Sequence, residues 1–140
     1  MQWLIFALLS AVFAALVSIL AKLGLKDINS DLGTAIRTTV VLIFTWGIAL
    51  FRGQGYGIKT ITAKNWMFLI LSGIATGLSW LFYFRALQLG KVSKVAPIDK
   101  LSTVLVVIFS ILILKEELTL STIIGAILIG TGTVVLVLGF

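Results

Sequence analysis

The chain has 140 residues, of which 60% are hydrophobic and 11% charged, and its mean hydropathy is +1.20. A soluble domain of this size covers its apolar interior with polar residues, and this chain has too few of them to do so. A net charge of +6 would suggest nucleic acid as the partner of a soluble protein. Here anionic lipid headgroups are the simpler partner, and no nucleic-acid partner is expected.

Five apolar stretches follow one another along the chain. Each is close to the ~20 residues with which an α-helix crosses the ~30 Å hydrocarbon core of a bilayer. Because the runs are continuous and not alternating, they favour helices over a barrel. The predicted spans are 3–21, 32–51, 66–87, 95–114 and 122–140. We therefore predict an all-α integral membrane protein, a bundle of five transmembrane helices that forms a single domain over residues 1–140.

The boundaries of these spans rest on residues that begin and end helices. The first run lacks the positive start and small-residue cleavage site of a signal peptide, so it is expected to be a mature helix. Gly24 follows the first span and Gly90 the third. Pro97 is expected in the first turn of the fourth span, where a missing N–H costs nothing.

The third span carries the clearest polar pattern. Ser72, Thr76, Ser79 and Tyr83 follow the spacing i, i+4, i+7, i+11 and therefore share one face of a helix, with Trp80 beside them. In a bilayer such a stripe should face protein or water and not acyl chains. The alternative is that the hydroxyls bond to carbonyls one turn back or across a helix interface. We favour a cavity lined by these five residues, with Trp46 of the second span opposite.

Charged residues inside the spans gather toward one membrane face. Arg37, Asp99 and Lys100 each lie roughly 6–8 Å inside that boundary, at ~1.5 Å per residue. Long cations reach water from such depths, but a short carboxylate does not. Asp99 is therefore expected to pair with Arg37, Arg85 or Lys22, although it is also the only acid inside a span and so the only obvious proton carrier. The cations form a positive entrance that suits an anionic or zwitterionic cargo.

The fifth span differs in kind, because glycines and not polar residues recur along it. Gly125, Gly132 and Gly139 are spaced by seven, with Gly130 between them. Small residues let helix backbones approach closely, within one chain or between two. We favour a dimer seam, because this helix has almost no polar face to give to a cavity.

The orientation of the chain is nearly undetermined by its charges. Counting every cation gives seven on the face that holds Lys22 and Lys26 and four on the face that holds Arg52 and Lys59, and removing Arg37, Arg85 and Lys100 leaves four against four. The positive-inside rule then gives almost no preference. Either the chain inserts both ways, as an antiparallel homodimer requires, or the spans are drawn slightly wrong and the seven-to-four bias is real.

The most specific family motifs of the chain lie from Tyr83 onward. They are Tyr83-Phe84-Arg85-Ala86-Leu87, Gly90, Val95-Ala96-Pro97-Ile98, Leu101-Ser102-Thr103, Leu114-Lys115-Glu116-Glu117-Leu118-Thr119 and Ile124-Gly125-Ala126-Ile127-Leu128-Ile129-Gly130-Thr131-Gly132. With them the chain resembles, over its whole length, the EamA-type domain of the drug/metabolite transporter superfamily. Glu116 matches the family's loop glutamate, and Arg37 is similar to its second-helix arginine. Lys115 stands where a glycine often precedes that glutamate, a departure that should not change the fold.

Most members of that superfamily carry two inverted five-helix domains, so the resemblance implies that two copies of this chain pair antiparallel. The related small multidrug-resistance proteins pair in this way and use a first-helix glutamate to exchange protons for cationic drugs. The first span here holds no acid, which argues against that activity.

The sequence therefore predicts a secondary transporter of a small metabolite that works by alternating access at a midplane cavity, in a bacterial or archaeal cytoplasmic membrane. The alternative is a non-transporting scaffold or subunit that pairs with a homologous partner. An enzyme is not expected, because the chain has no His or Cys from which to assemble the usual nucleophilic or metal sites. Neither a metal nor a cofactor is expected.

Overall fold

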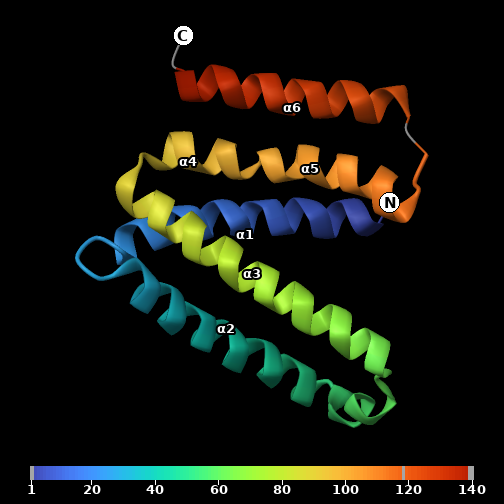
Figure 1. Cartoon of the computed structure of the whole chain (residues 1–140). Helices are drawn as coiled ribbons and strands as arrows, with labels where there is room; N and C mark the ends of the chain where they lie inside the picture. The colour runs from blue at the N-terminus through green and yellow to red at the C-terminus, as the bar shows by residue number, and fades with distance from the viewer. Residues whose placement is uncertain (1, 118, 139–140) are drawn as a thin grey trace. The chain divides into compact units, whose positions relative to one another are not determined.

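Each of the five apolar runs forms a helical span, because backbone N–H and C=O groups in lipid must be bonded within their own segment. The computed structural model describes residues 2–117 and 119–138. Its helices are α1 (Gln2–Gly24), α2 (Ser30–Phe51), the 3₁₀ helix η1 (Gln54–Thr60), α3 (Ala63–Leu89), α4 (Val92–Asp99), α5 (Leu101–Phe109), the π-helical turn η2 (Ser110–Leu114) and α6 (Leu120–Leu138) (Figure 1). The candidate spans are 23, 22, 27, 23 and 19 residues long, with α4, α5 and η2 forming the fourth. The predicted all-α membrane fold is confirmed.

Very little of these helices is covered by the chain itself. In the most apolar window of each span, no more than 11% of the residues are buried, and in the fourth span none are. A helix that is apolar on all sides and uncovered by its own chain needs lipid or another subunit around it. The chain thus offers most of its surface to a bilayer or to a partner.

The chain divides into two parts. One part is Leu20–Gln88, which holds the end of α1, all of α2 and η1, and nearly all of α3. The other joins Met1–Ile19 to Leu89–Phe140, with most of α1 and the helices α4 to α6. Each part is described by itself below.

The buried residues of the Leu20–Gln88 part gather at one end of its helices. They come from the end of α1 and the residue after it, the start of α2 and the end of α3, and they are Ala21, Leu25, Ser30, Gly33, Thr34, Phe84 and Leu87. Side chains that donate hydrogen bonds to backbone carbonyls hold the end of α3 against the end of α1 and the loop that follows it. Gln88 Nε2 donates to Leu25 O (3.1 Å) and Ile28 O (2.7 Å), and Lys22 Nζ donates to Leu87 O (2.5 Å).

The start of α2 is set by a side-chain cap. Asn29 Oδ1 accepts hydrogen bonds from Asp31 N (2.7 Å) and Leu32 N (3.4 Å), two amides that have no partner inside the helix. The carboxylate of Asp31 lies in the first turn, where the helix dipole favours negative charge. The helix therefore begins at Ser30, two residues before the predicted boundary.

In the other part, the fourth span is interrupted at Lys100. Because α4 begins at Val92, Pro97 is its sixth residue and not a first-turn residue as predicted. A proline there has no N–H to donate to the carbonyl one turn back. Lys100 N bonds to Pro97 O (3.0 Å) and Thr103 N to Lys100 O (3.0 Å), so two three-residue bonds carry the chain into α5. The prediction placed Pro97 wrongly because polar residues before Val95 also join the helix.

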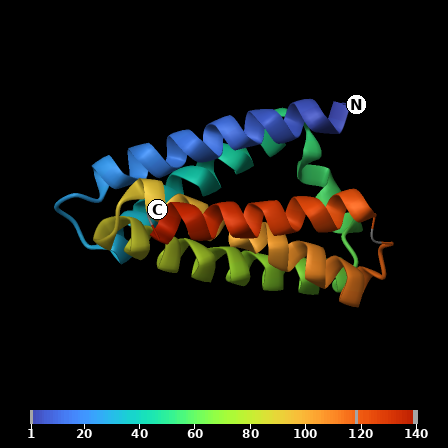
Figure 2. The same cartoon turned by 90° about the horizontal axis from the view of Figure 1, so that it is seen from above.

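Helix α6 packs along this interrupted span. It contacts both α4 and α5, and Figures 1 and 2 show α6 running beside α5. Thr133 of α6 is buried, with Oγ1 2.8 Å from Ile129 O and 3.3 Å from Pro97 O. Lys94 Nζ donates to Val137 O (2.9 Å) near the end of α6. These bonds join α6 to α4.

The fourth span ends in a strained residue. Lys115 caps η2 with φ +56° and ψ +34°, a left-handed conformation that suits glycine better than lysine. The turn brings Glu116 N within 3.2 Å of Ser110 O. Glycine is the residue that the family resemblance leads us to expect at this position, and the backbone shows why.

Candidate substrate-binding site

Arg37 of α2 lies against aromatic rings of α3. Its Cζ is 4.0 Å from the ring centroid of Phe84 and 5.6 Å from that of Trp80. Phe84 is 1% exposed and also makes an edge contact with the Tyr83 ring at 5.5 Å. Contacts between a cation and a ring contribute about 2 kcal/mol when water is excluded. The rings therefore help to hold the guanidinium in place.

One nitrogen of this guanidinium has no acceptor. Arg37 Nη1 is buried and makes no hydrogen bond to any residue that the structure describes. A buried donor left unpaired costs on the order of 1–3 kcal/mol, and more when it carries charge. Arg37 is seven residues beyond Ser30, so it lies about 10 Å along the helix at ~1.5 Å per residue. Arg37 is thus farther from the start of its helix than from the predicted boundary at residue 32, because α2 begins at Ser30.

The predicted polar stripe of α3 lies on an exposed face of the chain. Ser72, Thr76 and Ser79 are exposed, and Tyr83 is half-buried. Thr76 Oγ1 donates to Ser72 O at 2.8 Å, which is the local bond that the alternative interpretation expects. A hydroxyl bonded to its own helix keeps a lone pair for another donor. The stripe can therefore serve both interpretations, and its role as a binding surface stays a prediction.

A shallow groove of about 400 Å³ lies between α2 and α3. Its lining residues are Asp31, Thr34, Ala35, Thr38, Thr39, Leu42, Gly77 and Leu81. The threonine hydroxyls donate to carbonyls one turn back, at 2.7 Å for Thr34, 2.8 Å for Thr38 and 3.0 Å for Thr39. The groove thus presents mainly methyl groups, with the carboxylate of Asp31 as its charged member.

Trp46, the other predicted cavity residue of α2, is 46% exposed. It follows Arg37 by nine residues, which is two and a half turns of helix. The two side chains therefore leave α2 on opposite faces, and one copy of α2 does not present both to a single groove. The assignment of Trp46 to the cavity stays a prediction.

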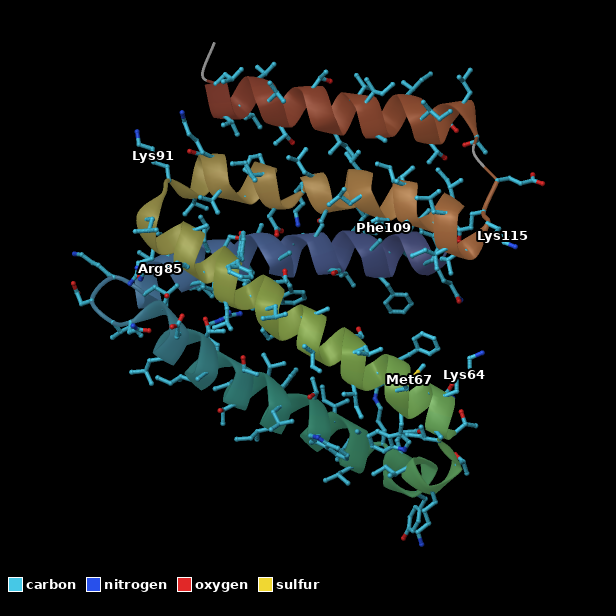
Figure 3. The ribbon with its side chains drawn as sticks, viewed as in Figure 1. Lys64, Met67, Arg85, Lys91, Phe109 and Lys115 are labelled. Carbon is cyan, nitrogen blue, oxygen red and sulfur yellow. The ribbon has the colours of Figure 1, made fainter. Side chains whose placement is uncertain are left out.

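Asp99 and Lys100 lie in the part that contains α4 to α6. Asp99 Oδ2 is 3.7 Å from Lys100 Nζ, with the two side chains 36% and 60% exposed. Ion pairs this exposed contribute little to stability. Among the cations expected to pair with Asp99, Arg85 donates to Gln88 Oε1 at 3.2 Å and sits at the end of α3 (Figure 3). Pairing of Asp99 with a cation of another helix stays a prediction.

The glycines of α6 face open space. A Cβ added at Gly125, Gly130 or Gly132 would meet no atom within 4 Å. The fourth member of the predicted dimer seam, Gly139, lies outside the described residues. A helix surface this free of side chains leaves room for a second backbone, and the seam stays a prediction.

Sequence reasoning missed two residues that organise this region, Phe84 and Gln88. Phe84 entered only as part of a family motif, although its spacing from Trp80 is the i, i+4 that stacks rings on one helix face. Gln88 gave no sequence signal, because its partners are carbonyls of a loop about sixty residues away in the chain. No group of three acidic, His or Cys residues that could hold a metal occurs among the described residues.

The helices and their exposed apolar faces define a multi-pass integral membrane protein. Residues 1–138 match the EamA-like transporter family, and the chain belongs to that family. Membership points to a transporter role and away from catalysis.

Two relatives are about as long as this chain. An uncharacterized transporter in the cobO 3′ region of a Sinorhizobium species is 49% identical over 135 residues, which cover 96% of each protein. An uncharacterized protein of Methanocaldococcus jannaschii is 39% identical over 67 residues, which cover 48% of this chain and 49% of that one. No solved structure matches the chain.

Proposed function

We propose that the chain is a secondary transporter that moves a small anionic or zwitterionic metabolite by alternating access as an inverted homodimer. The observation that carries this proposal is the exposed hydroxyl face of α3, where Ser72, Thr76 and Ser79 lie in mid-span without cover from their own chain. Hydroxyl groups at that depth are better placed against protein or water than against acyl chains. A second copy supplies the missing cover and a cavity.

An odd number of spans supports the inverted arrangement. Five spans put the two ends of the chain on opposite membrane faces, so a second copy that inserts the other way completes an inverted pair of the kind found in many secondary transporters. In this proposal residues 1–140 act as one transmembrane domain. Arg37, together with Lys100 and Asp99, forms the charged entrance, and the glycines of α6 form the seam between copies.

Labelling from one side of the membrane tests the arrangement. The chain has no cysteine, so single Gln54→Cys and Ser93→Cys variants give clean reporters. Both residues are exposed, Gln54 in η1 between α2 and α3 and Ser93 in the first turn of α4. An impermeant maleimide added to intact cells should label both at similar yield. Labelling of only one position would show a single orientation and rule out the self-inverted dimer.

Solute counterflow tests the transport step itself. Purified protein in liposomes preloaded with unlabelled carboxylic acids or amino acids should accumulate the matching radiolabelled compound, and protein-free liposomes should not. The second candidate function is a non-transporting scaffold, which the local hydroxyl bonds favour, since Thr76, Thr38 and Thr45 all donate to carbonyls of their own helix. Uniform absence of counterflow across anionic and zwitterionic solutes would favour the scaffold.

A further inference from the structure

We infer that Arg37 is the anchor of an oxyanion site, and that the transported solute carries a carboxylate or phosphate that this guanidinium binds. This inference rests on the proposed transport function and names the chemical group through which the cargo is held. The environment of this cation is unusual. The guanidinium lies over Phe84 and beside Trp80, and Nη1 is buried without an acceptor.

The aromatic rings contact the guanidinium but offer it no hydrogen-bond acceptor of the strength of an oxygen, so its N–H groups are left to a ligand. These N–H bonds point outward in the plane of the group. Carboxylate and phosphate oxygens match that edge with two parallel hydrogen bonds. Arg37 is half-buried and not sealed, so an oxyanion can reach the exposed part of the edge. A small turn of the group then gives Nη1 an acceptor.

The local surroundings supply no competing anion on the same helix face. Asp31, the acid of α2, is six residues before Arg37, which places it about 120° away around the helix and in the groove with Thr34 and Thr38. Asp99 has its own partner in Lys100 at 3.7 Å. A soluble ligand is therefore the acceptor that we assign to Arg37, with Asp99 as the internal competitor that the test must separate.

An oxyanion could also come from the phosphate of a lipid headgroup. Arg37 Nη1 is buried and the guanidinium lies against the Phe84 ring of α3, whereas headgroup phosphates stay at the membrane surface. This burial favours a small solute that enters between α2 and α3. The two sources are separated by offering one without the other.

Thermal unfolding with added ligand measures binding directly, because a ligand of the folded state raises Tm in proportion to RT ln(1 + [L]/Kd). The purified protein in dodecyl maltoside is titrated with inorganic phosphate and with acetate, against sodium chloride at equal ionic strength. Wild-type protein should show a rise in Tm with phosphate or acetate beyond that with chloride. Arg37→Gln should weaken the apparent affinity about 10- to 100-fold, since a charge-assisted hydrogen bond is lost.

Matched variants distinguish the effect of the paired N–H donors of Arg37 from the effect of its positive charge alone. Arg37→Lys keeps the charge but not the paired donors, and should lose at least half of the ligand-induced rise in Tm even where Arg37→Gln is too unstable to purify. Arg52→Gln removes the same charge from an exposed position at the other end of α2 and should leave the rise unchanged. Equal loss in Arg52→Gln and Arg37→Gln would overturn the site.

Two further arms decide between the possible acceptors. A rise that appears only after Asp99→Asn would mean that an internal ion pair fills the site, and the inference would fail. A rise that depends on Arg37 but occurs with added phosphatidylglycerol and not with soluble phosphate or acetate would assign the site to lipid and overturn the cargo assignment.

Counterflow keeps this inference separate from the proposed function. If wild-type protein carries solutes and Arg37→Gln carries oxyanions equally well, the oxyanion site at Arg37 is ruled out and the proposed transport function is retained. If ligand raises Tm through Arg37 but no solute is carried, the transporter falls and the oxyanion site is a binding site only. Loss of carboxylate counterflow in Arg37→Gln together with the lost rise in Tm supports both.

Discussion

Single residues in this chain are constrained most where backbones meet, and Gly33 is the clearest case. It lies in the first turn of α2, facing the loop that follows α1, and it is buried. A Cβ built at Gly33 would overlap the side chain of Leu25 and lie 3.2 Å from Ile28 Cδ1. Leu25 is 3% exposed, so it has little room to move aside. Glycine at this position lets α2 and the end of α1 pack.

Gly33→Ala should therefore lower the free energy of unfolding by about 1–3 kcal/mol, the usual cost of overpacking a filled site. Gly47→Ala is the matched control, because Gly47 lies in the same helix with nothing within 4 Å of its added Cβ. That control should be neutral or stabilising by about 0.5–1 kcal/mol, since alanine favours a helix interior. Thermal unfolding in detergent measures both, and equal Tm values for the two variants would contradict the packing argument.

Lys115 is the second constrained residue, and its constraint is conformational. Its φ of +56° is costly for a side chain with a Cβ and free for glycine. Lys115→Gly should raise the free energy of unfolding by about 0.5–1 kcal/mol relative to Lys115→Ala, once the greater freedom of glycine in the unfolded chain is included. Both variants remove the charge, so their difference in Tm isolates the backbone. A Tm for Lys115→Ala at or above that of Lys115→Gly would show that the turn relaxes to negative φ.

At the scale of elements, the sequence predicts where each helix begins and ends well, but it predicts poorly which helices pack against one another. Span length and apolar composition are local properties, which is why all five spans were found within three residues at their starts. The sequence does not predict the interruption at Lys100, and it places Pro97 wrongly in the first turn, because the position of Pro97 depends on where α4 begins. The rings under Arg37 were missed because periodicity identifies a face of a helix but not what packs against it.

Helix α3 shows this limit most clearly, because its exposed hydroxyl groups agree both with a cavity lining and with hydroxyls that only bond to their own helix. Thr76→Val keeps the shape and removes the hydroxyl that bonds Ser72 O. The change in unfolding free energy should stay within about 0.5 kcal/mol, as for most exposed substitutions. The apparent KM in counterflow should rise by about tenfold if the hydroxyl contacts the cargo, since one hydrogen bond contributes about 1 kcal/mol or somewhat more.

Thr131→Val in α6 is the control for that change. Thr131 is exposed and donates to Ile127 O at 2.6 Å, so it has the same local bond on a helix without a polar stripe. Its KM should not change. A rise in KM for both variants, or for neither, would remove the hydroxyl face of α3 from the transport path.

At the scale of the whole molecule, function depends on which way each copy is inserted. The cations outside the embedded positions lie near span ends: Figure 3 shows Lys64 at the start of α3, and Lys91 and Lys115 at opposite ends of the fourth span. With the embedded residues left out, four cations remain on each face. Such a balance is a property of the whole chain that no single helix reveals.

Shifting this balance should orient the chain. Lys59→Gln with Lys64→Gln leaves two cations against four, so the face with Lys26 and Lys91 should become cytoplasmic because positive loops are retained inside. Cysteine at Gln54 should then label fully from outside and cysteine at Ser93 should not. Lys26→Gln with Lys91→Gln should give the reverse pattern.

Each pair of substitutions alone should reduce counterflow, because copies inserted one way cannot form an inverted dimer. Mixing the two oppositely oriented variants in one membrane should restore counterflow. Counterflow that persists in both singly oriented preparations would show that transport does not need the inverted pair.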